Sequence, residues 1–310
     1  MQQLFYGFIK IWVLLSLKIF CKKVVFHNPQ QLAAGGPLII AANHPNSFFD
    51  AILIGAFMQQ PVHFITRGDV FQKRWARAIL EQLNMMPIYR IRDGKEKLSL
   101  NQQTFDHSVD VLKANGIVLI FVEGLCDYQT TLLPLKKGAP RILLSCWQQG
   151  IDAKVLPVWL RYNSFFSFGK KIEINFGNIF GKEAVNSNSP DGEAITKINA
   201  ATSQELLRLC NIRYQFLLPS GLKRFLFAIP AITGLLLNFP LYIVTKKIVH
   251  PLTKKDIHYD SVMFGVLTFF YPVYVALLIF TAYHFTHSGY SFLLIALLPL
   301  LARFYTIWKR

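Results

Sequence analysis

Three apolar segments in the last third of the sequence constrain the fold of this chain more than any other feature. They occupy residues 225–244, 261–284 and 290–307. A helix needs about 20 mostly apolar residues to cross a bilayer, and the second segment meets that requirement comfortably. The third is barely long enough, so a water-soluble bundle of buried core helices is the alternative. We predict a C-terminal membrane region over residues 219–310, with two or three hydrophobic segments.

Pro230, Gly234 and Pro240 interrupt the first of these segments. Proline inside a helix removes a backbone hydrogen bond and clashes with the preceding turn. We therefore expect either a kinked span or a re-entrant segment buried against protein. Basic residues gather near the ends of the apolar segments: Lys246, Lys247, Lys254, Lys255, Lys309 and Arg310. Because basic loops tend to stay in the cytoplasm, we expect an integral membrane protein with its active site on that side, at the inner membrane if the source is bacterial.

The amino terminus is also apolar, but it carries two lysines. Residues 4–20 contain Lys10 and Lys18, and no small-residue cleavage site follows them, so a removable signal peptide is not expected. Lysines of this kind extend toward water while their apolar neighbours enter the headgroup boundary. Residues 1–23 are therefore predicted to form an interfacial helix rather than a clean span.

Between these apolar ends, residues 24–218 show short β-rich runs that alternate with longer helical stretches. This alternation is typical of an α/β domain. The predicted strands are 24–26, 37–42, 62–66, 86–88, 117–121, 155–161 and 171–176. The predicted helices are 47–59, 71–83, 97–114, 138–149 and 191–213.

The charge of the chain is lopsided, with 33 Lys and Arg against 17 Asp and Glu. Such a surface attracts anionic phosphates and anionic lipid headgroups. Nucleic-acid binding is the alternative, but it requires a basic groove lined with exposed aromatics, whereas much of the aromatic content lies in the apolar ends. We therefore expect no nucleic-acid partner. We also expect no metal site, because the four cysteines are scattered without zinc-ligand spacing and His284 and His287 lack acidic companions.

The motif with the clearest chemistry is NHPNSFFD at 43–50, which follows an apolar strand and precedes a helix. An imidazole titrates near neutral pH, so His44 can act as a general base if a carboxylate fixes its tautomer, and Asp50 is the candidate. Six helical residues rotate by about 240°, so the pairing requires His44 to lie outside the helix. The alternative is a capping turn that contains these residues by chance.

Four segments of the chain resemble, in order, the glycerolipid acyltransferases, a family that includes lysophosphatidate and glycerol-3-phosphate acyltransferases. The first is the motif at 43–50, in which five residues separate His44 from Asp50, where the family usually has four. This spacing is similar to an HPN-type variant seen in some acyltransferases for glycerol 3-phosphate or dihydroxyacetone phosphate. The second is FITRGDVF at 64–71, where the resemblance places Arg67 near the substrate phosphate.

The third segment is GIVLIFVEG at 116–124, with Val122 in place of the usual proline. The resemblance places Glu123 and Gly124 at the acceptor site. Residues 125–127 replace the family's usual hydroxylated and basic residues, so an altered head-group pocket is expected. The segment LLPLKKGAPR follows, and positive charge near the acceptor would come from Lys136, Lys137 and Arg141.

The fourth segment is VLPVWLRY at 155–162, where Pro157 is expected to end a buried strand beside the acyl-donor path. The resemblance implies a central mixed sheet flanked by helices, and an enzyme of phospholipid biosynthesis that needs no cofactor. It would move a fatty acyl group from acyl-CoA or acyl-carrier protein to glycerol 3-phosphate or lysophosphatidate, directly and without an acyl-enzyme. Backbone donors at the start of the 47–59 helix are candidates for stabilising the oxyanion. A lyso-aminolipid acceptor and a catalytically silent lipid-binding protein are the alternatives.

Overall fold

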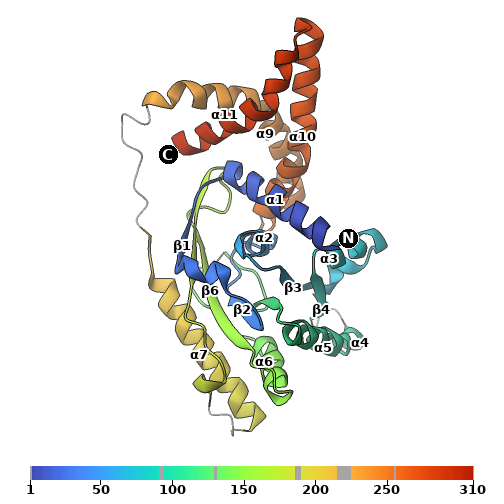
Figure 1. The fold of residues 1–310 in the computed structure, drawn as a ribbon, viewed down its shortest axis with the longest axis vertical. Coiled ribbons are helices and arrows are strands. Elements are labelled where there is room, and N and C mark those ends of the chain that lie inside the picture. Colours follow the sequence, from blue (N-terminus) through green and yellow to red (C-terminus); the bar gives the residue numbers. More distant parts are fainter. Residues whose placement is uncertain are drawn as a thin grey trace.

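A seven-stranded mixed sheet forms the centre of the chain (Figure 1). The computed structural model describes residues 2–90, 94–128, 131–185, 190–214, 225–254 and 256–309. The strands lie in the order β1 (Cys21–His27), β7 (Lys170–Phe176), β6 (Lys154–Tyr162), β2 (Leu38–Ala42), β5 (Ile117–Phe121), β3 (Val62–Arg67) and β4 (Met85–Ile88). The five strands from β6 to β4 run parallel, whereas β7 and β1 run the opposite way.

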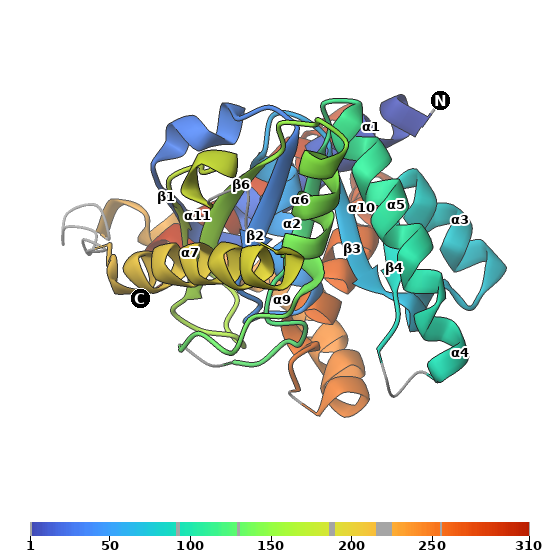
Figure 2. The same cartoon turned by 90° about the horizontal axis from the view of Figure 1, so that it is seen from below.

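Helices cover both faces of this sheet, which explains why every residue of β2 is buried. One face packs against α1 (Gln2–Phe20) and α2 (Phe48–Phe57). The opposite face, nearest the viewer in Figure 2, packs against α5 (Leu100–Lys113), α6 (Gly138–Gln148) and α7 (Asp191–Asn211). Shorter helices complete the domain: η1 (Pro29–Ala33), η2 (Gly68–Phe71), α3 (Arg74–Gln82), α4 (Lys95–Leu98) and η4 (Lys182–Ala184).

The predicted α/β class is thus confirmed, and the predicted strands and helices of this domain have ends that differ by at most three residues from those observed. Pro157 is the exception, because it lies inside β6 rather than at its end. Its carbonyl accepts a hydrogen bond from the Gly177 amide, and the regular β6–β7 ladder begins only at Val158. The missing N–H of the proline therefore falls where no ladder bond is lost.

Three C-terminal helices, α9 (Ala228–Thr253), α10 (Tyr259–Thr286) and α11 (Leu294–Trp308), gather beside the sheet domain, and a short helix, η5 (Gly289–Leu293), precedes α11 (Figure 1). The helix α9 continues through Pro240 and extends beyond the first apolar segment, so that it includes Lys246 and Lys247. At Gly234, an added Cβ would lie 2.1 Å from the Leu301 carbonyl oxygen, so glycine allows α9 and α11 to pack closely. The predictions for Lys255, Arg310 and the boundary near residue 219 lie outside the described residues.

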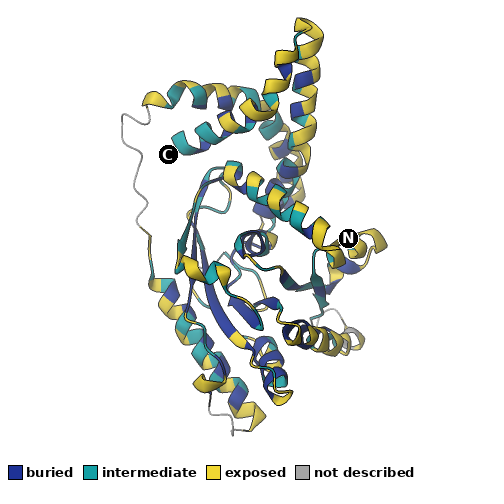
Figure 3. Ribbon diagram, in the orientation of Figure 1, coloured by how far each residue is buried: buried dark blue, intermediate teal, exposed yellow. Residues whose placement is uncertain are grey.

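Within the described ranges, four helical segments are long and apolar enough to cross a membrane: α1, α9, α10 and residues 289–308. Many of their large side chains face outward, as the exposed surfaces of these helices show (Figure 3). This exposure suggests membrane association. Whether α1 lies in the interface, as predicted from its lysines, or crosses the bilayer stays a prediction.

Candidate active site

The residues of the candidate site lie at the carboxyl ends of the parallel strands. His44 follows β2, Glu123 follows β5, Arg67 ends β3 and Tyr162 ends β6. In open α/β sheets this edge is where ligands bind, because adjacent loops diverge there and leave a crevice. The topology thus brings together residues that are far apart in the sequence.

His44 and Asp50 form the centre of this site. The Nδ1 atom of His44 lies 2.9 Å from Oδ2 of Asp50, which is in the first turn of α2. The carboxylate is fully buried, whereas the imidazole is 18% exposed. The imidazole also stacks on Phe121, with ring centroids 3.7 Å apart. This arrangement fixes the ring and leaves Nε2 as the nitrogen that can take a proton from a substrate.

The Asp50 carboxylate is held by two donors besides His44. The Asn46 amide donates to Oδ2 at 2.7 Å, and the Tyr162 hydroxyl donates to Oδ1 at 2.5 Å. A buried carboxylate that accepts several hydrogen bonds is held in one orientation. Burial and the nearby Asp50 charge raise the pKa of Tyr162 well above its usual value, so this hydroxyl remains a donor.

The turn between β2 and α2 is conformationally unusual. Ser47 has φ of 51°, a positive value that residues other than glycine rarely adopt. Its amide donates to the Cys126 sulfur at 3.0 Å. Strain of this kind persists only where the surroundings over-determine the backbone, and here it allows Asn46 to reach Asp50.

The first amides of α2 do not form the free set of oxyanion donors that the sequence suggested. The amides of Asn46, Ser47, Phe49 and Asp50 already donate to Asp50 Oδ2, Cys126 Sγ, Ser261 Oγ and the Ser47 carbonyl. The start of this helix is therefore used largely to hold the turn itself.

Glu123 braces His44 from the neighbouring strand. Its Oε2 accepts a hydrogen bond from the His44 amide at 3.1 Å, and its Oε1 accepts one from the Leu133 amide at 2.9 Å. Burial raises the pKa of this carboxyl, and the two backbone hydrogen bonds partly oppose the shift. Glu123 thus links the histidine to the loop that follows β5, while its predicted contact with the acceptor stays a prediction.

The predicted cations are distributed unequally around this site. The Lys136 side chain passes over Gly124, where an added Cβ would lie 2.8 Å from Lys136 Cγ. Lys137 and Arg141 are exposed at the start of α6. Arg67 pairs with the exposed Asp69, 3.1 Å from Nε to Oδ1. Burial raises the pKa of Asp69, but the hydrogen bond and charge of Arg67 lower it overall.

Several residues of the site were missed by sequence reasoning. Tyr162 closes the fourth family-like segment, so its position at a strand end was a usable signal. The contacts of Phe121, Asn46 and Cys126 depend on the turn geometry and had no such signal. Across the described residues, no group of three or more His, Cys, Asp or Glu side chains could hold a metal ion.

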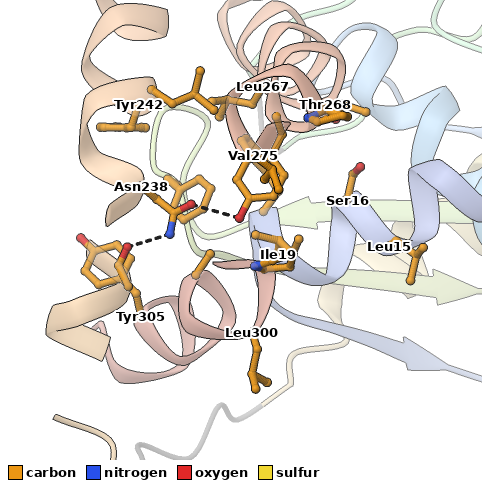
Figure 4. Close-up of a pocket in the computed structure, with 18 of the residues that line it drawn as sticks. Leu15, Ser16, Ile19, Asn238, Tyr242, Leu267, Thr268, Val275, Leu300 and Tyr305 are labelled. Atoms are coloured by element: carbon orange, nitrogen blue, oxygen red, sulfur yellow. Dashed lines mark hydrogen bonds between the residues drawn. The ribbon is translucent and has the colours of Figure 1, made fainter. Parts of the chain in front are cut away.

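A large apolar cavity lies apart from this site, among α1, α9, α10 and α11 (Figure 4). Its volume is about 850 Å³. Asn238 is a polar residue of its lining. Its side-chain amide accepts a hydrogen bond from the Tyr271 hydroxyl and donates one to the Gly234 carbonyl. Phe20 and Phe264 line the cavity and pack edge-on against Phe49 of α2. This aromatic layer separates the cavity from the His44–Asp50 pair.

Comparison with known proteins gives concordant matches. The acyltransferase family model matches residues 23–161. The chain is 27% identical over 131 residues to a 1-acyl-sn-glycerol-3-phosphate acyltransferase of Bacillus subtilis (strain 168), an alignment that covers 42% of this chain and 59% of that relative. The crystal structure of the LPA acyltransferase PlsC from Thermotoga maritima superimposes with a TM-score of 0.50 at 16% identity, covering 69% of this chain and 83% of that one. At this identity the structural likeness shows the fold alone.

Proposed function

Since residues 23–161 belong to the acyltransferase family, we propose that the chain transfers a fatty acyl group from acyl-CoA or acyl-carrier protein to the hydroxyl of glycerol 3-phosphate or lysophosphatidate. The observation that carries this proposal is the His44–Asp50 pair, with the carboxylate buried and the ring at the carboxyl edge of the sheet. The similarity to the 1-acyl-sn-glycerol-3-phosphate acyltransferase of Bacillus subtilis supports a glycerol phosphate type of acceptor.

In the proposed reaction, His44 acts as the general base. Its Nε2 removes the proton of the acceptor hydroxyl as that oxygen attacks the thioester carbonyl, and Asp50 stabilises the imidazolium that forms. Collapse of the tetrahedral intermediate breaks the carbon–sulfur bond, and the imidazolium returns the proton to the leaving thiolate. The acyl group thereby moves in a ternary complex, and Ser47 takes no covalent part. Its hydroxyl instead lies 2.6 Å from His258 Nδ1.

The positive charge of the chain supports a phosphorylated acceptor. Lys136 lies against Gly124, directly beside Glu123, and Lys137 and Arg141 follow it at the start of α6. Arg67 also projects from the carboxyl edge of the sheet, but a phosphate would have to compete with Asp69 for its guanidinium. Lys136 is therefore the preferred candidate among the proposed phosphate contacts.

We also propose that the active site faces the cytoplasm. The turn at residues 43–47, between β2 and α2, is called the catalytic turn below. The loop between α9 and α10 lies beside it, because His258 contacts Ser47. Lys246 and Lys247 lie in the later part of α9, toward the same loop. Basic residues near a membrane helix end favour the cytoplasmic side, so the catalytic turn would share that side. Labelling of Lys137→Cys by a membrane-impermeant thiol reagent in inside-out but not right-side-out vesicles would support this orientation.

The test of the reaction compares His44→Ala with His107→Ala, a histidine of α5 on the opposite face of the sheet. Purified full-length protein in lipid vesicles is assayed with acyl-CoA or acyl-carrier protein, and with glycerol 3-phosphate, lysophosphatidate or a lyso-aminolipid as acceptor. We expect His44→Ala to lower turnover by about 10²- to 10⁴-fold while the protein stays folded. Near-normal turnover of His44→Ala would defeat the mechanism. A wild-type protein that binds the vesicles but acylates none of these acceptors would favour the silent lipid-binding alternative.

A further inference from the structure

The first turn of α10 contacts the catalytic turn directly, although it lies beyond the segment that matches the acyltransferase family. The Ser261 hydroxyl accepts from the Phe49 amide at 3.1 Å and donates to the Asn46 carbonyl at 3.3 Å. Just before the helix, His258 Nδ1 lies 2.6 Å from the Ser47 hydroxyl. Residues at the start of a predicted membrane helix therefore contact Asn46, Ser47 and Phe49, at the end of the turn and in the first turn of α2.

Asp260 provides the most deeply buried of these contacts. Its Oδ2 accepts a hydrogen bond from the Asn46 side-chain amide at 2.7 Å and pairs with the Lys170 ammonium at the start of β7. The Asp260 and Lys170 side chains are 2% and 0% exposed. The Lys170 ammonium also lies 5.5 Å and 5.6 Å from the ring centroids of Phe20 and Phe49. The network thus joins β7, α1, α2 and α10 at one point.

Asn46 connects this network to the catalytic pair. Its backbone amide donates to the Asp50 carboxylate, while its side chain donates to Asp260. One residue is therefore held between two buried carboxylates, one that contacts His44 and one that belongs to α10. Because Ser47 next to it has a strained backbone, the turn needs such external contacts to keep its conformation.

A buried ion pair is a weak source of stability, because desolvation of both charges offsets their attraction. Replacement of such a pair by apolar side chains of similar volume is often neutral for stability. The geometry instead gives the Asp260 carboxylate a specific second task, which is to accept the Asn46 amide.

We infer that Asp260 is a positioning residue for the transfer reaction, and that it acts through Asn46 to hold the turn that keeps Asp50 against His44. The inference rests on the proposed function. Its consequence is that the C-terminal helices complete the active site as well as anchoring the protein.

The test uses two charge-free pairs of substitutions, because Asp260→Leu alone would leave Lys170 buried without its partner and destabilise the fold. In the variant with Lys170→Met and Asp260→Leu, Asn46 loses its acceptor. In the variant with Lys170→Met and Asp260→Asn, the new side chain retains an oxygen that can accept the Asn46 amide. Thr306→Val is the control, because the hydroxyl of this buried α11 residue donates to the Arg303 carbonyl of its own helix.

We expect both double variants to remain folded, with kcat reduced about 10- to 100-fold in the leucine variant and largely restored in the asparagine variant. The KM for donor and acceptor should stay within about twofold, because the buried Asp260 carboxylate is inferred to act through Asn46. Adding Asn46→Ala to the leucine variant should cause no further loss, since both changes break the same link. Wild-type kcat in a folded leucine variant, or equal losses in the two double variants, would overturn the inference.

A second readout is independent of acyl transfer. The Ser47 amide donates to the Cys126 sulfur, and burial raises the pKa of that thiol to about 12, so alkylation by iodoacetamide should be slow. Release of the turn should accelerate labelling of Cys126 in the leucine variant and leave the fully buried Cys146 of α6 unchanged. If the wild-type protein transfers no acyl group, the proposed function fails. Cys126 labelling then still decides whether Asp260 holds the turn, and unchanged labelling refutes it.

Discussion

The sheet domain and the C-terminal helices differ in how far they bury their apolar side chains. Ile39 and Ile40 of β2 are fully buried, whereas Phe269 and Phe285 of α10 are 73% and 79% exposed. The sheet domain therefore buries its apolar side chains in a core, whereas the later turns of α10 present an apolar surface of the kind that a membrane covers. Under the proposed function, the two regions would have separate tasks: the sheet domain would hold the catalytic pair, and the helices would associate with lipid.

The division between these regions does not follow the sequence. Tyr259, Met263 and Phe264 of α10 belong to the same apolar core as β2 and α2. Asp260, among them, is bound to Asn46 of the catalytic turn. The first turns of α10 thus pack as part of the sheet domain, and only the later turns expose their apolar side chains. The boundary between the two regions therefore runs through α10.

The largest effect should come from Asp50→Asn, which tests whether chemistry resides in the sheet domain. An asparagine amide would donate to His44 Nδ1 and place the proton on the nitrogen that must act as base. We expect turnover to fall by about 10²- to 10⁴-fold, measured as acyl transfer to the preferred acceptor. The exposed Asp110→Asn of α5 is the matched control. Near-normal turnover by Asp50→Asn would show that the reaction does not require the Asp50 carboxylate.

Tyr162→Phe should have the next largest effect, because it removes the hydroxyl that donates to Asp50 Oδ1 while preserving the ring. A hydrogen bond to a charged group contributes about 1.5–3 kcal/mol, so we expect kcat to fall at least about tenfold. Tyr283→Phe, near the end of α10, should leave kcat unchanged. Equal kinetics for the two variants would indicate that Asp50 does not need Tyr162.

A third experiment perturbs the C-terminal helices away from the first turn of α10. Gly234→Ala would push a methyl group into the Leu301 carbonyl of α11, so we expect about 1–3 kcal/mol of destabilisation, measured as a lower Tm. Gly265→Ala of α10 is the matched control, because an added Cβ there meets no atom within 4 Å. If kcat of the folded Gly234→Ala protein falls as far as that of Tyr162→Phe, the two regions are coupled more widely than through the first turn of α10.

The smallest effect should be the pH dependence of stability in Glu123→Gln. Burial raises the pKa of Glu123 in the folded state, so its favourable contribution is present below its unfolded pKa and is lost as the pH rises through the folded value. Because glutamine does not titrate, the Tm of the wild type should fall relative to that of the glutamine variant as the pH rises through the folded pKa of Glu123.

Glu205→Gln provides the opposite case. The Arg208 hydrogen bond lowers the pKa of Glu205, so the wild type should be the more stable protein near neutral pH. This advantage should disappear as the pH falls through the folded pKa. If the Tm differences from the wild type change with pH in the same direction for Glu123→Gln and Glu205→Gln, burial is not the dominant influence on the pKa of Glu123.

Much of the architecture could be predicted because its signals are local. Continuous apolar runs such as 38–42 and 117–121 identify strands buried on both faces, and these strands are observed where expected. The extension of α9 beyond residue 244 was missed, because a polar composition indicates a loop only when no neighbouring helix supports the backbone. Pro157 was placed at a strand end for a similar reason, since the sequence does not show which ladder position lacks a partner.

The α/β class and the apolar helices could be predicted from residue periodicity, and the proximity of His44 to Asp50 from the short turn that joins them. The contacts of Asp260 with Asn46 and Lys170 could be seen only in the folded structure. These residues lie in separate elements, and their contact depends on strand order and helix packing, which no local pattern encodes. Side-chain hydrogen bonds form at distances near 3 Å, so only a completed fold places such distant groups within reach.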